Sequence, residues 1–184
     1  MKGVFGMTED ATFNVLLYVD GSQYSFSASV YAATLLKHIS NMNITVVQFQ
    51  ESIEDEVIAS EYNVMDIWPI SPNSVWMQQI INDADDETKK QYQDILTRTN
   101  EIFSRRSHCV KHEILVAKNN VVDTAEALID YAEKNSFELI IIGTRGFSEV
   151  KGLIFGSFAH TVLNRAPMPV QLIKKLPKKF IDNY

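Results

Sequence analysis

The sequence predicts an α/β protein built on a parallel β-sheet with helices on both faces. Two observations lead to this prediction. Short apolar runs alternate along the chain with segments of helical periodicity. The runs are continuously apolar instead of alternating with polar residues, as expected for strands that are buried on both faces. With 184 residues, of which 46% are hydrophobic, we expect one domain that spans residues 1–184.

Five of the apolar runs are predicted strands, and several are rich in β-branched residues. They cover residues 13–19, 44–49, 112–117, 137–142 and 169–174. Helices are predicted between them, over residues 25–39, from 85 to about 106, from Val122 or Asp123 onward, and over 158–164. In the first helix, Phe26, Val30 and Ala33 recur at helical spacing and should face the sheet. Asp123 with Glu126 comes close to a capping box at the start of the third helix.

One segment breaks the alternation. Residues 50–83 begin with many acidic side chains and later hold Trp68 and Trp76. A connection of this length without a clear period is unusual inside a compact domain. We interpret it as an insert that serves as a flap or a contact surface.

Composition excludes several classes of protein. The net charge is −6 and no basic stripe dominates, which argues against nucleic-acid binding. The local basic cluster of Lys174, Lys175, Lys178 and Lys179 is expected to be a solvated C-terminal tail, residues 174–184. No apolar run is long enough to span a bilayer, so we expect no membrane partner. The single cysteine, Cys109, permits no internal disulfide, which fits the cytoplasm.

The most informative motif is the segment Gly143-Thr144-Arg145-Gly146, which follows the fourth predicted strand and precedes Gly156-Ser157. Glycine lets backbone N–H groups approach an anion closely, and a helix N-terminus adds free donors and a favourable dipole. The motif therefore predicts a phosphate site, and with it a bound nucleotide. Alternatively, the glycines only form a turn after the strand, as glycines commonly do.

The first predicted strand ends in Val19-Asp20-Gly21-Ser22. Ligands of open parallel sheets sit beyond the carboxyl ends of the strands, where the strand order reverses. If the first and fourth strands are neighbours at that point, Asp20 faces the glycine loop across one crevice. Its carboxylate can accept hydrogen bonds from ribose hydroxyls. Asp20 could instead cap the first helix.

From Val15 to Lys174 the chain resembles the universal stress proteins of the UspA type. The resemblance rests on the opening strand with Asp20, on the fourth strand with its loop, and on Ala166-Pro167-Met168-Pro169-Val170. The spacing G-x2-G-x9-G-[S/T], which marks the ATP-binding branch of that family, is met by Gly143, Gly146, Gly156 and Ser157. The resemblance implies a Rossmann-like fold of the adenine nucleotide α-hydrolase type, with strand order 3-2-1-4-5.

The resemblance also implies how ATP would be held. Asp20, flanked by Val19 and Gly21, would hold the ribose, and the backbone around Phe49 would meet the adenine edge. The phosphates would be held by residues of the two glycine segments, which are Gly143, Arg145, Gly146, Gly156, Ser157 and Phe158. Mg²⁺ or Mn²⁺ would bridge the phosphates, with protein ligands that the sequence does not identify. A homodimer through the last strand, residues 169–174, is expected as well.

Three functions remain open at this stage. The first is a regulatory stress-response protein whose shape or partner contacts depend on bound ATP. The second is a slow ATPase or phosphotransferase, although the chain has no Walker-type lysine. The third is a dimerisation module without a nucleotide.

Overall fold

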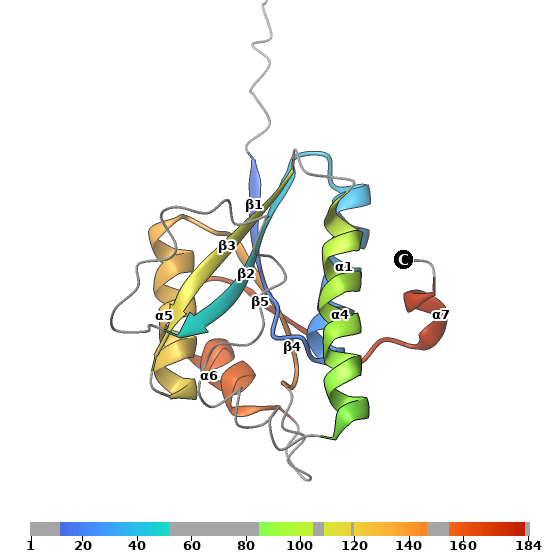
Figure 1. Ribbon diagram of the computed structural model, residues 1–184. Coiled ribbons are helices and arrows are strands. Elements are labelled where there is room, and N and C mark those ends of the chain that lie inside the picture. Colours follow the sequence, from blue (N-terminus) through green and yellow to red (C-terminus); the bar gives the residue numbers. More distant parts are fainter. Residues whose placement is uncertain (1–11, 52–84, 105–108, 119, 147–154, 183–184) are drawn as a thin grey trace, which may run out of the picture.

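The structure, a computed structural model, describes residues 12–51, 85–104, 109–118, 120–146 and 155–182. Figure 1 shows a sheet flanked by helices on both faces. The sheet has five parallel strands in the order β3-β2-β1-β4-β5. The predicted fold class and strand order are therefore confirmed. The insert at residues 50–83 falls almost wholly outside the described residues.

Strands and helices alternate along the chain as the apolar pattern predicts. The elements are β1 (Phe13–Tyr18), α1 (Gln23–His38), β2 (Met42–Glu51), α4 (Asp86–Ser104), β3 (Val110–Ala117), α5 (Val121–Lys134), β4 (Leu139–Gly143), α6 (Ser157–Arg165), β5 (Val170–Ile173) and α7 (Lys178–Ile181).

Strand β1 is the centre of the sheet. It pairs with β2 from Phe13↔Met42 to Tyr18↔Val47, and with β4 from Val15↔Leu139 to Leu17↔Ile141. The chain leaves β1 toward β2 and later returns to the other side of β1 as β4. The carboxyl ends of β1 and β4 therefore lie side by side at the point where the strand order reverses.

Alternate residues of β1 serve two separate cores. Val15 and Leu17 pack on the side of α1, whereas Leu16 and Tyr18 pack on the side of α5 and α6. All four side chains are buried. Burial on both faces explains why the strands are continuous apolar runs.

The helix caps differ from the sequence-based expectation. Helix α1 is capped by Ser22, whose Oγ accepts a hydrogen bond from the N–H of Ser25 at 3.1 Å. Helix α5 begins earlier than predicted and is capped by Asn120, whose Oδ1 accepts from the N–H of Asp123 at 2.9 Å. The capping box expected at Asp123 is thus wrong, because Asn120 offers a short polar side chain three residues upstream.

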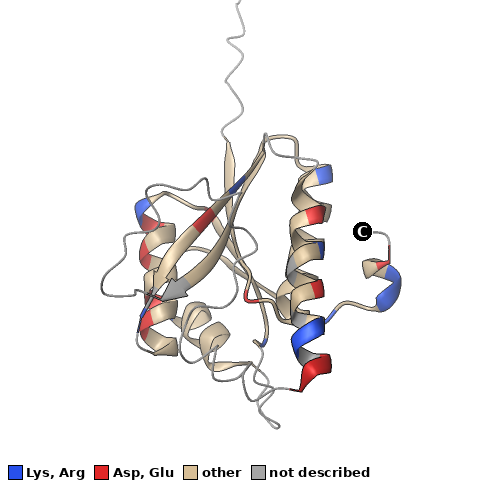
Figure 2. Cartoon of the chain, viewed as in Figure 1, with Lys and Arg blue, Asp and Glu red and all other residues tan. Residues whose placement is uncertain are grey.

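The C-terminal segment packs against α1. The N–H of Leu176 donates to Ser27 Oγ at 3.0 Å, and Leu176 and Ile181 pack beside Phe26. The four lysines of this segment are exposed. In Figure 2, charges of both signs are distributed along α4 and α5, and lysines gather on α7. In the described part of the chain, no helix has both the length and the apolar character needed to cross a membrane.

Candidate functional site

The residues of the loop after β1 have separate structural roles. Val19, buried beside the strand end, donates its N–H to the carbonyl of Val47 at 3.0 Å. Gly21 has a φ of 77°, a conformation that favours glycine. Ser22 then caps α1. The short segment 19–22 thus turns the chain from β1 into α1 and leaves Asp20 at the carboxyl end of the central strand.

Asp20 is a buried carboxylate, with 9% of its surface exposed. Its Oδ1 accepts a hydrogen bond from the N–H of Ser22 at 2.9 Å. Burial raises the pKa of the Asp20 carboxyl above its ordinary value, and hydrogen bonds from Ser22 and Ser25 oppose that rise. The helix cap is Ser22, so Asp20 is not needed for that role.

The glycine loop is anchored through Thr144, which is buried. The N–H of Thr144 donates to the carbonyl of Ile173, and its carbonyl accepts from the N–H of Gly156, both at 2.9 Å. The first hydrogen bond holds the loop to β5. The second holds it to the start of α6, so that Gly143–Gly146 and Gly156 are fixed to each other although residues 147–154 lie outside the described part.

The N-terminus of α6 is built differently from those of α1 and α5. Its N-cap is Gly156, and no side chain makes a capping hydrogen bond there. The first N–H groups of a helix have no partner within the helix. Ser157, Phe158 and Ala159 therefore present backbone donors, together with the positive end of the helix dipole, beside the glycine loop.

These segments converge on Gly146. A Cβ atom at Gly146 would lie 2.9 Å from Asp20 Oδ2, and one at Gly156 would lie 3.6 Å from the Cα of Arg145. The β1 loop, the glycine loop and the start of α6 are therefore in contact range. This confirms that the loops after the first and fourth strands face each other. Arg145 is half-buried, and its backbone lies next to Gly156.

Gly143 has a packing role that the sequence does not reveal. A Cβ at this position would lie 2.7 Å from Tyr24 Cβ, 2.8 Å from Tyr24 C and 2.9 Å from Ser25 N. Distances below 3.0 Å are not compatible with a side chain, so Gly143 lets β4 approach the first turn of α1. That approach brings the two loops together.

Three aromatic rings form one wall near the same end of the sheet. The ring of Phe158 stacks on Tyr18, with centroids 4.5 Å apart and planes at 26°. Phe49 meets Tyr18 edge-on at 5.7 Å. Sequence reasoning selected Phe49 and Phe158 for their backbones and missed Tyr18. The signal for Tyr18 is its place as the last residue of β1, two residues before Asp20.

Comparisons with known proteins identify the family of the chain. A sequence model of the universal stress protein family matches residues 60–174, more than half of the chain. The chain belongs to the universal stress protein family. Among the described residues of this universal stress protein, no group of three or more His, Cys, Asp or Glu side chains is placed to hold a metal ion.

Curated relatives cover the chain to different extents. The stress response protein NhaX of Bacillus subtilis is 25% identical over 164 residues, which are 87% of this chain and 96% of NhaX. A universal stress protein of Methanocaldococcus jannaschii is 38% identical over 55 residues, 30% of this chain and 32% of that relative. An uncharacterized protein of Schizosaccharomyces pombe is 38% identical over 52 residues, 28% of this chain and 8% of its own length.

Solved structures of universal stress proteins share the fold. UspA from Lactobacillus plantarum has a TM-score of 0.54 at 18% identity, covering 88% of this chain and 97% of that one. The Archaeoglobus fulgidus protein in complex with dAMP has a TM-score of 0.50 at 18% identity, covering 89% and 98%. A universal stress protein in complex with cAMP has a TM-score of 0.52 at 17% identity, covering 90% and 98%.

Two glycines of this universal stress protein should respond differently to substitution. Gly143→Ala should lower the free energy of unfolding by about 1–3 kcal/mol, because the new Cβ meets backbone atoms that cannot rotate away. Gly156→Ser should leave it unchanged or raise it, because the position has room and a serine can cap α6. Urea denaturation of both variants measures the difference; equal stabilities would contradict the packing role of Gly143.

The buried carboxylate should reduce stability at neutral pH. The pKa of Asp20 is higher in the folded than in the unfolded protein. The contribution of Asp20 to the free energy of unfolding is therefore most favourable below its ordinary pKa of 3.8, and it is lost as the pH rises through the folded pKa. Asp20→Asn keeps an acceptor for Ser22 and should be more stable than the wild type at pH 7. The gain should shrink as the pH falls toward 3.8.

The matched control is Asp130→Asn, at an exposed position of α5. It should change stability by less than about 0.5 kcal/mol. Urea denaturation at several pH values measures both variants. An Asp20→Asn variant that is less stable than the wild type at pH 7 would show that the ionised carboxylate is net stabilising.

Proposed function

We propose that this chain is a cytoplasmic regulatory protein that binds an adenine nucleotide, ATP in particular, at the carboxyl ends of β1 and β4. The observation that carries the proposal is the contact distance between Asp20 and Gly146. This distance supports a site in which an acceptor suited to ribose hydroxyls lies beside backbone donors suited to phosphates. A nucleotide is a ligand that has both kinds of group next to each other.

In the proposed complex, Asp20 Oδ2 accepts from the ribose, since Oδ1 is already bonded to the N–H of Ser22. The phosphates lie against the glycine loop and the uncapped start of α6, within reach of Arg145. Adenine lies toward the carboxyl end of β2, near the backbone of Phe49. The related proteins solved with dAMP and with cAMP favour an adenine nucleotide over other phosphate ligands.

We further propose that Mg²⁺ or Mn²⁺ enters with the nucleotide, held by phosphate oxygens and water, which are the hard ligands that these ions prefer. Among the described residues of the β1 loop, the glycine loop and the start of α6, Asp20 is the one with a carboxylate. We assign this carboxylate to the ribose and not to the ion. Rapid hydrolysis needs a group that orients water at the outer phosphate. We therefore propose binding without rapid turnover, with regulation through the occupied state.

The site predicts opposite effects of one substitution on stability and on affinity. Gly156→Ser should retain full stability yet bind ATP with Mg²⁺ more weakly, because the serine oxygen takes a donor that a phosphate would use. Gly146→Val should weaken binding further, about tenfold or more, since hydrogen bonds to charged groups contribute roughly 1.5–3 kcal/mol each. Isothermal titration calorimetry measures both affinities.

Phosphate release is followed in the same samples. If Gly156→Ser and Gly146→Val both bind ATP with wild-type affinity, the nucleotide does not bind at this site. Steady release that Asp20→Ala abolishes would favour the slow ATPase over the regulatory role.

We also propose a homodimer through the last strand. Strand β5 is at the edge of the sheet, and its residues Val170 and Leu172 are half-buried. An apolar edge strand is a template for pairing with another chain. Light scattering after size exclusion should give twice the mass of one chain.

Gln171→Lys, at an exposed position of β5, should shift the protein toward the monomer, because a symmetric interface brings the two new charges together. Gln93→Lys, on the exposed side of α4, is the control and should remain dimeric. A wild-type mass of one chain would exclude the dimer.

A further inference from the structure

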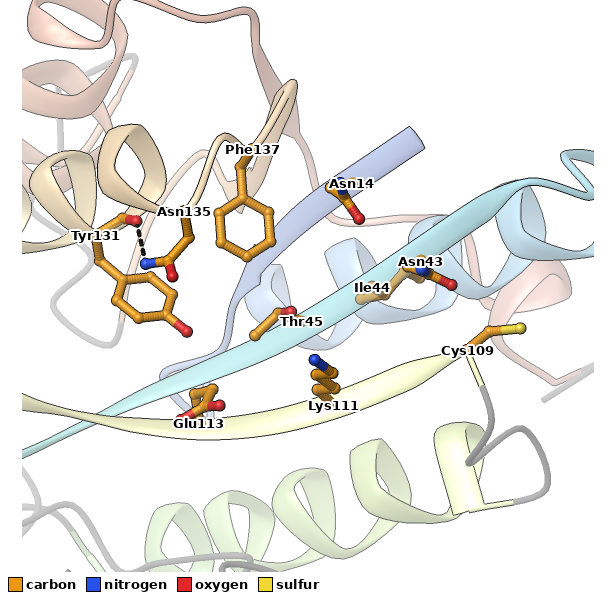
Figure 3. A pocket seen from close by; sticks show the side chains of 10 residues that line it. All are labelled: Asn14, Asn43, Ile44, Thr45, Cys109, Lys111, Glu113, Tyr131, Asn135 and Phe137. Carbon is orange, nitrogen blue, oxygen red and sulfur yellow. Dashed lines mark hydrogen bonds between the residues drawn. The ribbon is translucent and has the colours of Figure 1, made fainter. Parts of the chain in front are cut away.

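A pocket lies at the opposite end of the sheet from the proposed nucleotide site. Its volume is about 280 Å³. It opens over the first residues of β1, β2 and β3, next to the C-terminal end of α5 (Figure 3). Helices α5 and α6 cover the apolar half of this sheet face, whereas the strand starts carry polar side chains there. These include Asn14, Asn43, Thr45, Lys111 and Glu113.

Two opposite charges face this pocket from one strand. Lys111 and Glu113 are alternate residues of β3, so both point to the same side, with Cα atoms about 7 Å apart. Lys111 is exposed and Glu113 is half-buried. Among the residues that the structure describes, neither has an ion-pair partner. A ligand with a single charge would be attracted by one of these two side chains and repelled by the other.

The opposite wall of the pocket favours a cation near Glu113. Tyr131 and Phe137 form an aromatic pair, with centroids 5.8 Å apart. In Figure 3 the hydroxyl of Tyr131 points toward the strands that carry Thr45 and Glu113. The C-terminal end of α5 adds the negative end of its dipole, and aromatic faces attract ammonium groups. Burial, and then the charge of Glu113, raise the pKa of Tyr131, so its hydroxyl adds no charge to the pocket.

We propose that this pocket binds a small zwitterion of the amino-acid class. Its ammonium group lies between Glu113 and the aromatic pair, and its carboxylate lies at Lys111. Thr45, which is 8% exposed, lies at the pocket floor with a hydroxyl for either group. Phe137 gives an apolar wall for a short side chain. The two charges of the pocket balance those of the ligand, and the volume suits a molecule of this size.

The experiment uses the full chain and titrates it with L-serine, L-valine and L-glutamine. Binding is followed by calorimetry and by the backbone amide NMR signals of residues 109–113 and 131–137. At least one amino acid should bind and move these signals. Ethylamine and propionate, which each keep one of the two charges, should bind at least about tenfold more weakly. Lys111→Met and Glu113→Gln should each weaken amino-acid binding by a similar factor.

Controls separate this pocket from the nucleotide site. Lys174→Met and Glu101→Gln remove exposed charges elsewhere and should bind the amino acid as the wild type does. Gly146→Val should also leave this binding intact. The proposal is overturned if no amino acid binds at up to about 10 mM, if both pocket variants bind as tightly as the wild type, or if propionate, ethylamine or adenine binds as well as the amino acids.

Discussion

The position of β1 between β2 and β4 is the constraint on which the rest of the structure depends. Because β1 is paired on both edges, its carboxyl end is fixed next to that of β4. Gly143 then lets the start of α1 approach β4, and Asp20 comes to lie beside Gly146. Asp20 and Gly146, more than a hundred positions apart in the sequence, are thus brought together by strand pairing and by the absence of a side chain at Gly143.

This arrangement has an energetic consequence. Asp20 is buried and receives hydrogen bonds from neighbouring serines, but burial still raises its pKa. A carboxylate in that state opposes folding at neutral pH. The start of α6 is likewise left without a side-chain cap, although serine or asparagine caps α1 and α5. Under the proposed function, both features lower stability and leave groups available to a nucleotide, as is common at functional sites.

Much of the fold could be predicted from the sequence because burial on both faces leaves a strong signal. The apolar run at residues 137–142 and its glycines indicated a strand and its loop, and the facing position of Asp20 followed from the rule for open sheets. The packing of Gly143 against Tyr24 could not be predicted, since it depends on the approach of two elements distant in sequence. The stack of Phe158 on Tyr18 is of the same kind.

The polar pocket could not be predicted for a different reason. Its polar residues on the sheet lie near the starts of strands, where single polar positions such as Thr45 and Glu113 are read as interruptions of an apolar run. Only the sheet order places them together on one face. The cap at Asn120 was missed because the loop before it gives no periodic signal.

The central claim is that the contact between Asp20 and Gly146 forms an adenine-nucleotide site. Mass spectrometry of the ligand released from protein purified without added nucleotide tests it most directly. We predict that the wild type releases ATP or another adenine nucleotide and that Gly146→Val releases little or none. A wild type that releases no adenine nucleotide, and whose melting temperature ATP and Mg²⁺ do not change, would contradict it.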